Sequence, residues 1–228
     1  MIVAARKPFE QIKAALAGCQ RVLVVGCGTC VAVCLAGGEK EVHILASQLR
    51  LAARVEGRGL LADEVTLERQ CDREFLEPLA RKVAGYDALL STACGAGVQL
   101  LAERYPDKPV LAALNTSFIG VAEGPGVWSE RCRACNDCLL SLTGGICPLT
   151  MCAKGLLNGP CGGAQEGRCE VEPERPCAWQ QIYDRLAAQG RLEVLRAIQP
   201  ARRHELGGPP QRLVHRAYAH RYRVAAGR

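Results

Sequence analysis

The sequence is poor in aromatic residues and contains no long apolar run. Phe, Trp and Tyr make up 4% of its 228 residues, which argues against a surface that stacks nucleic-acid bases. No apolar run reaches the about 18 residues needed to cross a bilayer, and the first 16 residues lack the apolar core and cleavage site of a secretory signal. We therefore expect a cytoplasmic protein without a membrane span, whose partners do not include nucleic acid.

Signatures of substrate turnover are also missing. The sequence has no Walker loop, and it fits the dinucleotide-binding fingerprint poorly, because Gly26 and Gly28 match the first two glycines but Val31 takes the place of the third. None of the four histidines lies in a general-base motif: we expect His43 in a strand, and the other three lie near the C-terminus. This pattern favours an electron carrier over an enzyme with its own substrate site.

Cysteine, in contrast, is abundant, with 14 residues. Extracellular disulfides would explain such a number, but the sequence shows no export signal. In a reducing compartment, closely spaced cysteines more often bind a metal ion or an iron–sulfur cluster. We therefore interpret the cysteines as metal or cluster ligands.

The positive charge is concentrated at the C-terminal end. The seven arginines and one glutamate after residue 200 account for the whole net charge of +6, so the rest of the chain is formally neutral. Two interpretations remain open for this basic tail, residues 200–228: a solvated extension, or an arm that docks on an acidic partner.

Residues 1–126 predict an α/β domain with a doubly wound parallel sheet, similar to flavodoxin and Rossmann folds. Short apolar runs alternate with helical patterns, as is typical of parallel sheets. The expected strands are 21–26, 41–46, 63–70, 86–93 and 108–115. The expected helices are 29–38, 47–57 with Ser47 as N-cap, 72–85 and 97–106.

A different composition follows. Residues 127–180 are rich in cysteine and glycine and have few apolar runs, so they cannot bury enough surface to fold alone. We expect a small module that bound metal staples together. Helical periodicity returns from residue 178, which predicts a C-terminal helix over 181–199 before the basic tail.

A first group of cysteines follows the expected strands. Cys27, Cys30 and Cys34 have the spacing i, i+3 and i+7, which places them within about 60° on one face of a helix. Cys94 follows the strand 86–93. Because the loops after parallel strands meet at one edge of the sheet, we predict that these four cysteines bind one [4Fe–4S] cluster.

Three other interpretations apply to this group. Cys71 follows the strand 63–70 and is either a reserve ligand or a thiol beside the ligands. Cys30 and Cys34 are alternatively small buried residues beneath the sheet, as cysteine often is. Cys19, in the expected first helix, is assigned to packing alone.

The second group contains eight cysteines. Its C-x2-C-x2-C run resembles the first three ligands of a bacterial ferredoxin cluster, but the next cysteine, before Pro148, follows after eight residues instead of three. The eight residues suffice for two clusters, or for one cluster and one four-thiolate zinc site, and the sequence does not divide them. They are Cys132, Cys135, Cys138, Cys147, Cys152, Cys161, Cys169 and Cys177.

The two cysteine-rich stretches together resemble a known family. "GCGTCVAVCLAGGEKEV" and "CRACNDC…GGICPLTMCAKGLLNGPCGG" are similar to the accessory, MetV-type iron–sulfur/zinc subunit of methylenetetrahydrofolate reductase. The resemblance extends over about residues 8–195 and excludes the basic tail. It implies a subunit that binds beside a flavin-containing catalytic subunit and passes electrons to its FMN.

Three functional hypotheses follow from the residues and the resemblance. In the first, one to three [4Fe–4S] clusters, with two expected, relay electrons from ferredoxin or an NADH-oxidising subunit to the reductase flavin. In the second, the cysteines bind zinc and the protein is a structural scaffold of the same reductase. In the third, a cluster iron with an open position binds a substrate or a corrinoid methyl donor.

Overall fold

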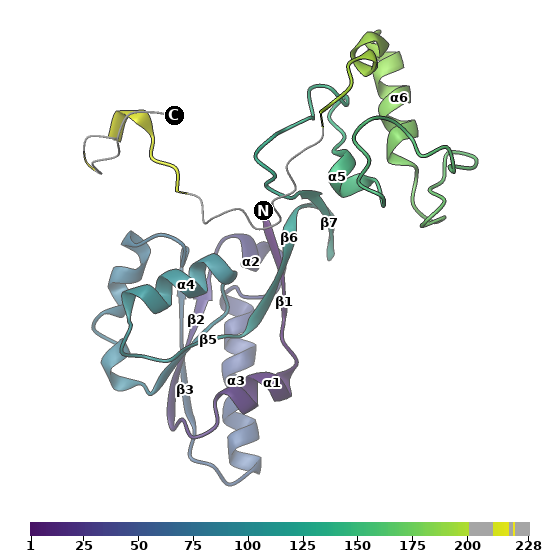
Figure 1. Ribbon diagram of the computed structural model, residues 1–228. Coiled ribbons are helices and arrows are strands. Elements are labelled where there is room, and N and C mark those ends of the chain that lie inside the picture. Colours follow the sequence, from purple (N-terminus) through teal and green to yellow (C-terminus); the bar gives the residue numbers. More distant parts are fainter. Residues whose placement is uncertain (201–211, 219–220, 222–228) are drawn as a thin grey trace.

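The computed structural model describes residues 1–200, 212–218 and 221. It contains a four-stranded parallel sheet, a separate three-stranded antiparallel sheet and a cysteine-rich segment with two short helices (Figure 1). The predicted parallel α/β sheet is therefore confirmed, whereas the antiparallel sheet was not predicted.

The parallel sheet has the strand order β3-β2-β4-β5. The chain runs from β2 outward to β3, and then returns past β2 to β4 and β5, so the winding direction reverses between β2 and β4. The central strand β2 is an uninterrupted apolar run because both of its faces are covered. The strands are β2 (Arg21–Cys27), β3 (Leu61–Leu67), β4 (Ala88–Ser91) and β5 (Val110–Ala112).

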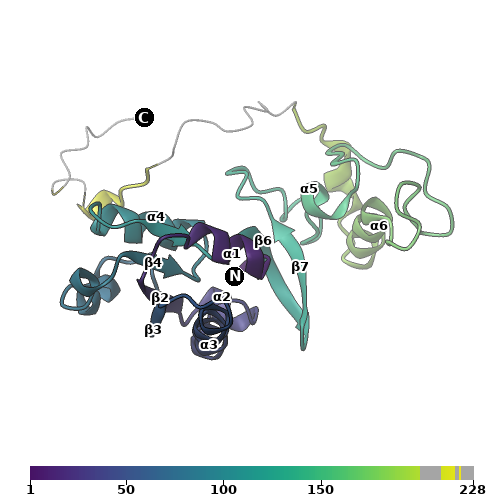
Figure 2. The same cartoon turned by 90° about the horizontal axis from the view of Figure 1, so that it is seen from below.

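Helices cover both faces of this sheet (Figure 2). On one face, Val22 and Val24 pack against α1 (Phe9–Ala15) and α3 (Glu39–Val55). On the other face, Leu23 and Val25 pack against the 3-10 helix η1 and against α4. The elements on that face are η1 (Glu74–Leu79), η2 (Val83–Gly85) and α4 (Gly95–Arg104).

The expected strand over 41–46 is wrong, because the residues form part of α3. The buried side chains of this helix recur every three or four residues, at Val42, Leu45, Ala46, Leu49 and Ala53, which is a helical period. His43 thus lies exposed on a helix, and Ser47 lies inside the helix instead of capping it. The helix begins instead after Gly38, whose N–H donates to the Glu41 carboxylate at 3.1 Å.

Two other expected helices are shorter than predicted. The region 72–85 forms the 3-10 turns η1 and η2, with Pro78 inside η1, because proline removes a backbone donor and crowds the preceding turn. The region 29–38 forms one turn, α2 (Cys30–Val33), after which Leu35 has a positive φ of 55°.

The antiparallel sheet has the order β1-β6-β7 and pairs the N-terminal strand with the end of the α/β region. Its strands are β1 (Ile2–Arg6), β6 (Leu114–Gly124) and β7 (Val127–Cys132). Val3, Ala4 and Leu114 pack against Val31 and Ala93, so this sheet covers part of the carboxyl edge of the parallel sheet. The predicted boundary after residue 126 lies in the turn between β6 and β7.

The cysteine-rich segment extends away from the parallel sheet beyond β6 and β7 (Figure 1). It contains α5 (Pro148–Met151), α6 (Ala178–Ala188) and η3 (Leu192–Arg196). Only Ile146, Trp179, Ile182 and Leu186 form its buried core. The helix expected over 181–199 is observed as α6, which begins at Ala178 and ends at Ala188. Gly190, two residues later, has a positive φ of 65°.

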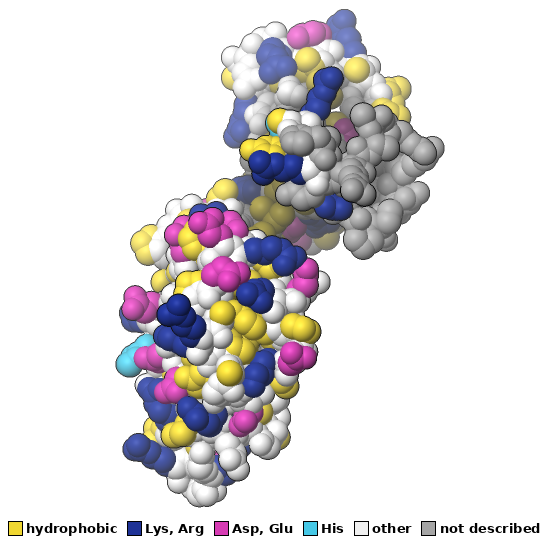
Figure 3. Space-filling view, turned by 90° about the vertical axis from the view of Figure 1, so that its left-hand side faces the viewer, with side chains coloured by type: hydrophobic (Ala, Val, Ile, Leu, Met, Phe, Trp, Pro, Cys, Tyr) yellow, Lys and Arg dark blue, Asp and Glu magenta, His cyan; other side chains and the backbone are white. Residues whose placement is uncertain are grey.

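The basic tail lies mostly outside the described residues, which include Pro200, residues 212–218 with the short 3-10 helix η4 (Arg216–Tyr218), and Arg221. Over the parallel-sheet half of the molecule, acidic and basic side chains are interspersed on the face shown in Figure 3. Among the described helices, none is long and apolar enough to cross a membrane.

Candidate functional site

Three loops that carry cysteines leave the carboxyl edge of the parallel sheet. Cys27 is the last residue of β2, Cys71 lies four residues after the end of β3, and Cys94 lies three residues after β4, as the N-cap of α4. In open parallel sheets, ligands bind at this edge where the winding direction reverses, which here is between β2 and β4. Cys27 and Cys94 therefore flank the expected binding position.

Glycines allow the turn after β2 to lie close to β3. The N–H of Gly28 donates to the carbonyl of Leu67 at 2.8 Å, and a Cβ on Gly28 would lie only 3.3 Å from that oxygen. A Cβ on Gly26 would lie 2.5 Å from Thr66 Oγ1. A larger residue at either position would push the Cys27 loop away from the end of β3.

A buried glutamine fixes the loop after β3, which carries Cys71. Gln70 is fully buried, and its Nε2 donates to the carbonyls of Val25 at 2.8 Å and Gly26 at 3.0 Å. Its Oε1 accepts a hydrogen bond of 2.7 Å from the hydroxyl of Ser91, at the end of β4. Gln70 thus connects the ends of β2 and β4 and holds its neighbour Cys71 above the sheet edge.

The first turn of α4 packs on the same glutamine. A Cβ on Gly97 would lie 2.9 Å from the Cβ of Gln70 and 2.8 Å from the Cβ of Ala93. The glycine thus brings the helix that begins at Cys94 against the loop that carries Cys71. Sequence reasoning missed Gln70, whose only signal is an amide side chain placed between a strand and a cysteine.

Cys71 lies at the surface. Its pKa is raised, first by partial loss of hydration and then by the thiols of Cys27, Cys94 and Cys30. Its role as a reserve ligand or as a thiol beside the ligands stays a prediction.

Cys34 lies in the same buried apolar cluster as Cys27, and Cys94 packs against this cluster. The Sγ of Cys34 donates to the carbonyl of Ala4 at 3.5 Å and to that of Val31 at 3.6 Å. The helix face expected from the i, i+3, i+7 spacing is shortened to the single turn α2, with Cys34 as its C-cap. Cys19 packs against the cluster of α1 and α3, and burial raises the pKa of its thiol.

The second group of cysteines is divided in space. Cys132 ends β7, and Cys135 and Cys138 follow in an exposed loop in which Ala134 and Asn136 have positive φ values of 50° and 59°. The hydroxyl of Thr150 lies 3.4 Å from the carbonyl of Arg131 and 3.5 Å from that of Cys147. This hydroxyl therefore brings Cys147, the N-cap of α5, next to the end of β7.

The other four cysteines of this group line one small cavity of about 20 Å³, and they are Cys152, Cys161, Cys169 and Cys177. The 14 cysteines, all in the described part of the chain, form no disulfide. Among the described side chains, no three Cys, His, Asp or Glu residues lie close enough to share one metal ion.

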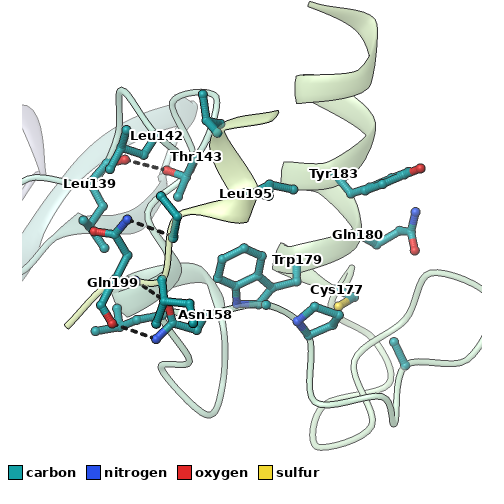
Figure 4. A pocket seen from close by; sticks show the side chains of 17 residues that line it. Leu139, Leu142, Thr143, Asn158, Cys177, Trp179, Gln180, Tyr183, Leu195 and Gln199 are labelled. Atoms are coloured by element: carbon teal, nitrogen blue, oxygen red, sulfur yellow. Dashed lines mark hydrogen bonds between the residues drawn. The ribbon is translucent and has the colours of Figure 1, made fainter. Parts of the chain in front are cut away.

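A larger apolar pocket of about 510 Å³ lies between α6, the loops that precede it and residues 194–199, which follow it (Figure 4). Trp179 forms part of its wall and donates its ring N–H to the carbonyl of Leu156 at 2.9 Å. Asn158 and the backbone of Gln199 form a pair of hydrogen bonds of 3.0 and 2.7 Å across it. Most of the described residues that line the pocket are apolar, so its wall offers mainly apolar contact.

Comparison with known proteins identifies the second half of the chain. Residues 111–205 match the family model described as methylene-tetrahydrofolate reductase C terminal. No curated protein and no solved structure matches the chain. The matched region begins in β5 and includes all eight cysteines of the second group. This region is therefore related to proteins of the methylenetetrahydrofolate reductase type.

Proposed function

We propose that this protein is an iron–sulfur electron-transfer subunit that associates with a flavin-containing methylenetetrahydrofolate reductase subunit and supplies electrons to its FMN. The match of residues 111–205 to a reductase C-terminal family supports the association with a reductase. The observation that carries the electron-transfer role is the meeting of cysteine loops from β2, β3 and β4 at the edge where the winding reverses.

The residues at this edge fit a [4Fe–4S] cluster. Four thiols are the ligand set that such clusters use, and we assign them to Cys27, Cys30, Cys71 and Cys94, with Cys71 in place of Cys34. The N-terminus of α4, directly after Cys94, favours negative charge on the sulfur ligands. When bound, the cluster takes up and releases one electron.

The protein's own residues position this site and limit its exposure. Gln70 holds the Cys71 loop against β2 and β4, and the glycines at 26 and 28 keep the Cys27 loop close to β3. Cys27 is 6% exposed, whereas Cys71 lies at the surface. The site is thus shielded by the sheet on one side and open to an electron donor or acceptor on the other.

The test begins with protein purified without oxygen from cells supplied with iron. We expect bound iron and acid-labile sulfide, and visible absorbance that dithionite bleaches. Mixing the reduced protein with a purified FMN-containing methylenetetrahydrofolate reductase should then restore the cluster absorbance while the flavin absorbance falls. Ferredoxin and an NADH-oxidising flavoprotein are the electron donors to test next.

The alternative is a zinc-binding scaffold of the same reductase. It predicts colourless protein that contains zinc and no iron, and binding to the reductase without electron transfer. Finding this composition in iron-supplied, oxygen-free preparations would refute the electron-transfer role.

A further inference from the structure

The small cavity at the end of the cysteine-rich segment is lined by Cys152, Cys161, Cys169 and Cys177. These four residues come from separate stretches of chain: the end of α5, two loops, and the residue before α6. The cavity volume of about 20 Å³ exceeds the about 10–15 Å³ that one water molecule requires. In the described structure these four sulfurs do not lie close enough to share one ion, so an ion bound here would draw them together.

Several contacts bring these stretches together. The ion pair of Lys154 with Glu170 connects the Cys152 loop to the Cys169 loop. A Cβ added to Gly163 would meet the carboxylate end of the Glu170 side chain, which places the Cys161 loop beside the same glutamate.

The backbone completes the arrangement at the fourth cysteine. The N–H of Cys177 donates to the carbonyl of Gly167 at 2.7 Å, and the N–H of Cys169 donates to that of Arg175 at 2.9 Å. A narrow hairpin thus joins the loop of Cys169 to the start of α6, next to the cavity.

The remaining cysteines of the segment lie elsewhere. Cys132, Cys135 and Cys138 belong to the exposed loop after β7, and Thr150 holds Cys147 near that strand. None of these four residues lines the small cavity. The structure therefore divides the eight cysteines into two groups of four, a division that the sequence alone could not provide.

We propose that Cys152, Cys161, Cys169 and Cys177 form a separate closed site for one tetrahedral Zn²⁺ ion, which staples the loops to α6. Four-thiolate coordination with no open position is typical of structural zinc. Binding releases the four thiol protons and leaves a site with two negative charges. The N-terminus of α6, directly after Cys177, partly neutralises them, whereas Lys154 and Glu170, which both line the cavity, form an ion pair with each other.

The ion would supply stability that the segment otherwise lacks. Only four buried residues form its apolar core, and a core of this size does not hold a fold by itself. Zinc coordination contributes folding free energy directly. The inference concerns this staple and does not rest on the electron-transfer role.

The test measures zinc and iron in full-length protein purified without oxygen. We expect about one zinc per chain. Cys169→Ser should remove the zinc and leave the iron content unchanged, whereas the matched variant Cys138→Ser should keep the zinc. The proposal would be overturned if Cys169→Ser kept its zinc content, or if it lost iron instead of zinc.

A second measurement uses the wild-type chain, so it does not depend on the folding of a variant. Thiols are alkylated before and after treatment with a zinc chelator, and the modified residues are identified by mass spectrometry. The proposal predicts that Cys152, Cys161, Cys169 and Cys177 become reactive together. Joint release of a set that includes Cys132 or Cys135 would contradict it. Absence of iron from the protein would refute the electron-transfer role but not the zinc site.

Discussion

Replacement of Gln70 by methionine tests how the sheet edge is held together. Methionine retains the length of the side chain but removes the amide, so the hydroxyl of Ser91 loses its acceptor and the carbonyl of Gly26 loses a donor. The carbonyl of Val25 keeps the N–H and hydroxyl of Thr92 at 2.9 and 3.2 Å. Because these two buried groups lose their partners, we expect Gln70→Met to lower the free energy of unfolding by about 2–4 kcal/mol.

The assay is denaturant unfolding of metal-free, reduced protein, followed by circular dichroism. The exposed Gln48, which accepts a hydrogen bond from Arg6, supplies the control, and Gln48→Met should change stability by less than about 0.5 kcal/mol. The double variant Gln70→Met with Ser91→Ala should be more stable than the sum of the single effects predicts, because the hydrogen bond between Ser91 and Gln70 then loses both of its partners together.

The same variant reports on the cysteine site. Because Gln70 holds the loop of Cys71, Gln70→Met should release bound iron to a chelator faster than wild-type protein does. If Gln70→Met unfolds within about 0.5 kcal/mol of wild type and retains its iron equally well, the assigned role of Gln70 is wrong.

Two further predictions concern the fold. Leu49 is 1% exposed in the cluster between α3 and β2, so Leu49→Ala should lower the free energy of unfolding by about 2–5 kcal/mol. Leu51 is 64% exposed, so the control variant Leu51→Ala should change it little. Equal effects of the two variants in denaturant titrations would contradict the placement of α3. The Asp87 carboxylate accepts the N–H groups of Gln20 and Arg21 at 2.7 and 2.8 Å, and the bonds from Arg21 and then Gln20 lower its pKa. The stabilising effect of Asp87 is therefore present above its ordinary pKa of about 3.9 and is lost as the pH falls through the lowered pKa. In Asp87→Asn, stability should consequently fall less steeply as the pH is lowered. An unchanged pH profile of thermal unfolding would refute this assignment.

Much of the parallel sheet could be predicted from the sequence, since apolar runs and helical patterns alternate over residues 21–115. The failure at α3 has a physical origin: "EVHILA" contains enough apolar residues for a strand, and only the longer pattern through Ala53 reveals the helical period. The antiparallel sheet was missed because β1 is short, and because the run 108–115 feeds two sheets, ending β5 at Ala112 and starting β6 at Leu114.

The cysteine sites show the same limits. Spacing alone grouped Cys34 with Cys27 and Cys30 on one long helix face, whereas the structure has one turn followed by a residue of positive φ, and Cys27 and Cys34 share one buried cluster. The role of Gln70 depends on side-chain contacts between three strands, which no local pattern encodes. The division of the eight C-terminal cysteines likewise depends on loop contacts such as that between Lys154 and Glu170.

The most direct test of the central claim compares two matched cysteine variants in oxygen-free preparations, by iron analysis and electron paramagnetic resonance of the dithionite-reduced protein. The account predicts that Cys71→Ser loses or alters the signal of one cluster, while Cys34→Ser, which removes a thiol buried beneath β1, retains the iron and signal of the wild type. Loss of the signal in Cys34→Ser with full retention in Cys71→Ser would contradict the site proposed at the edge of the parallel sheet.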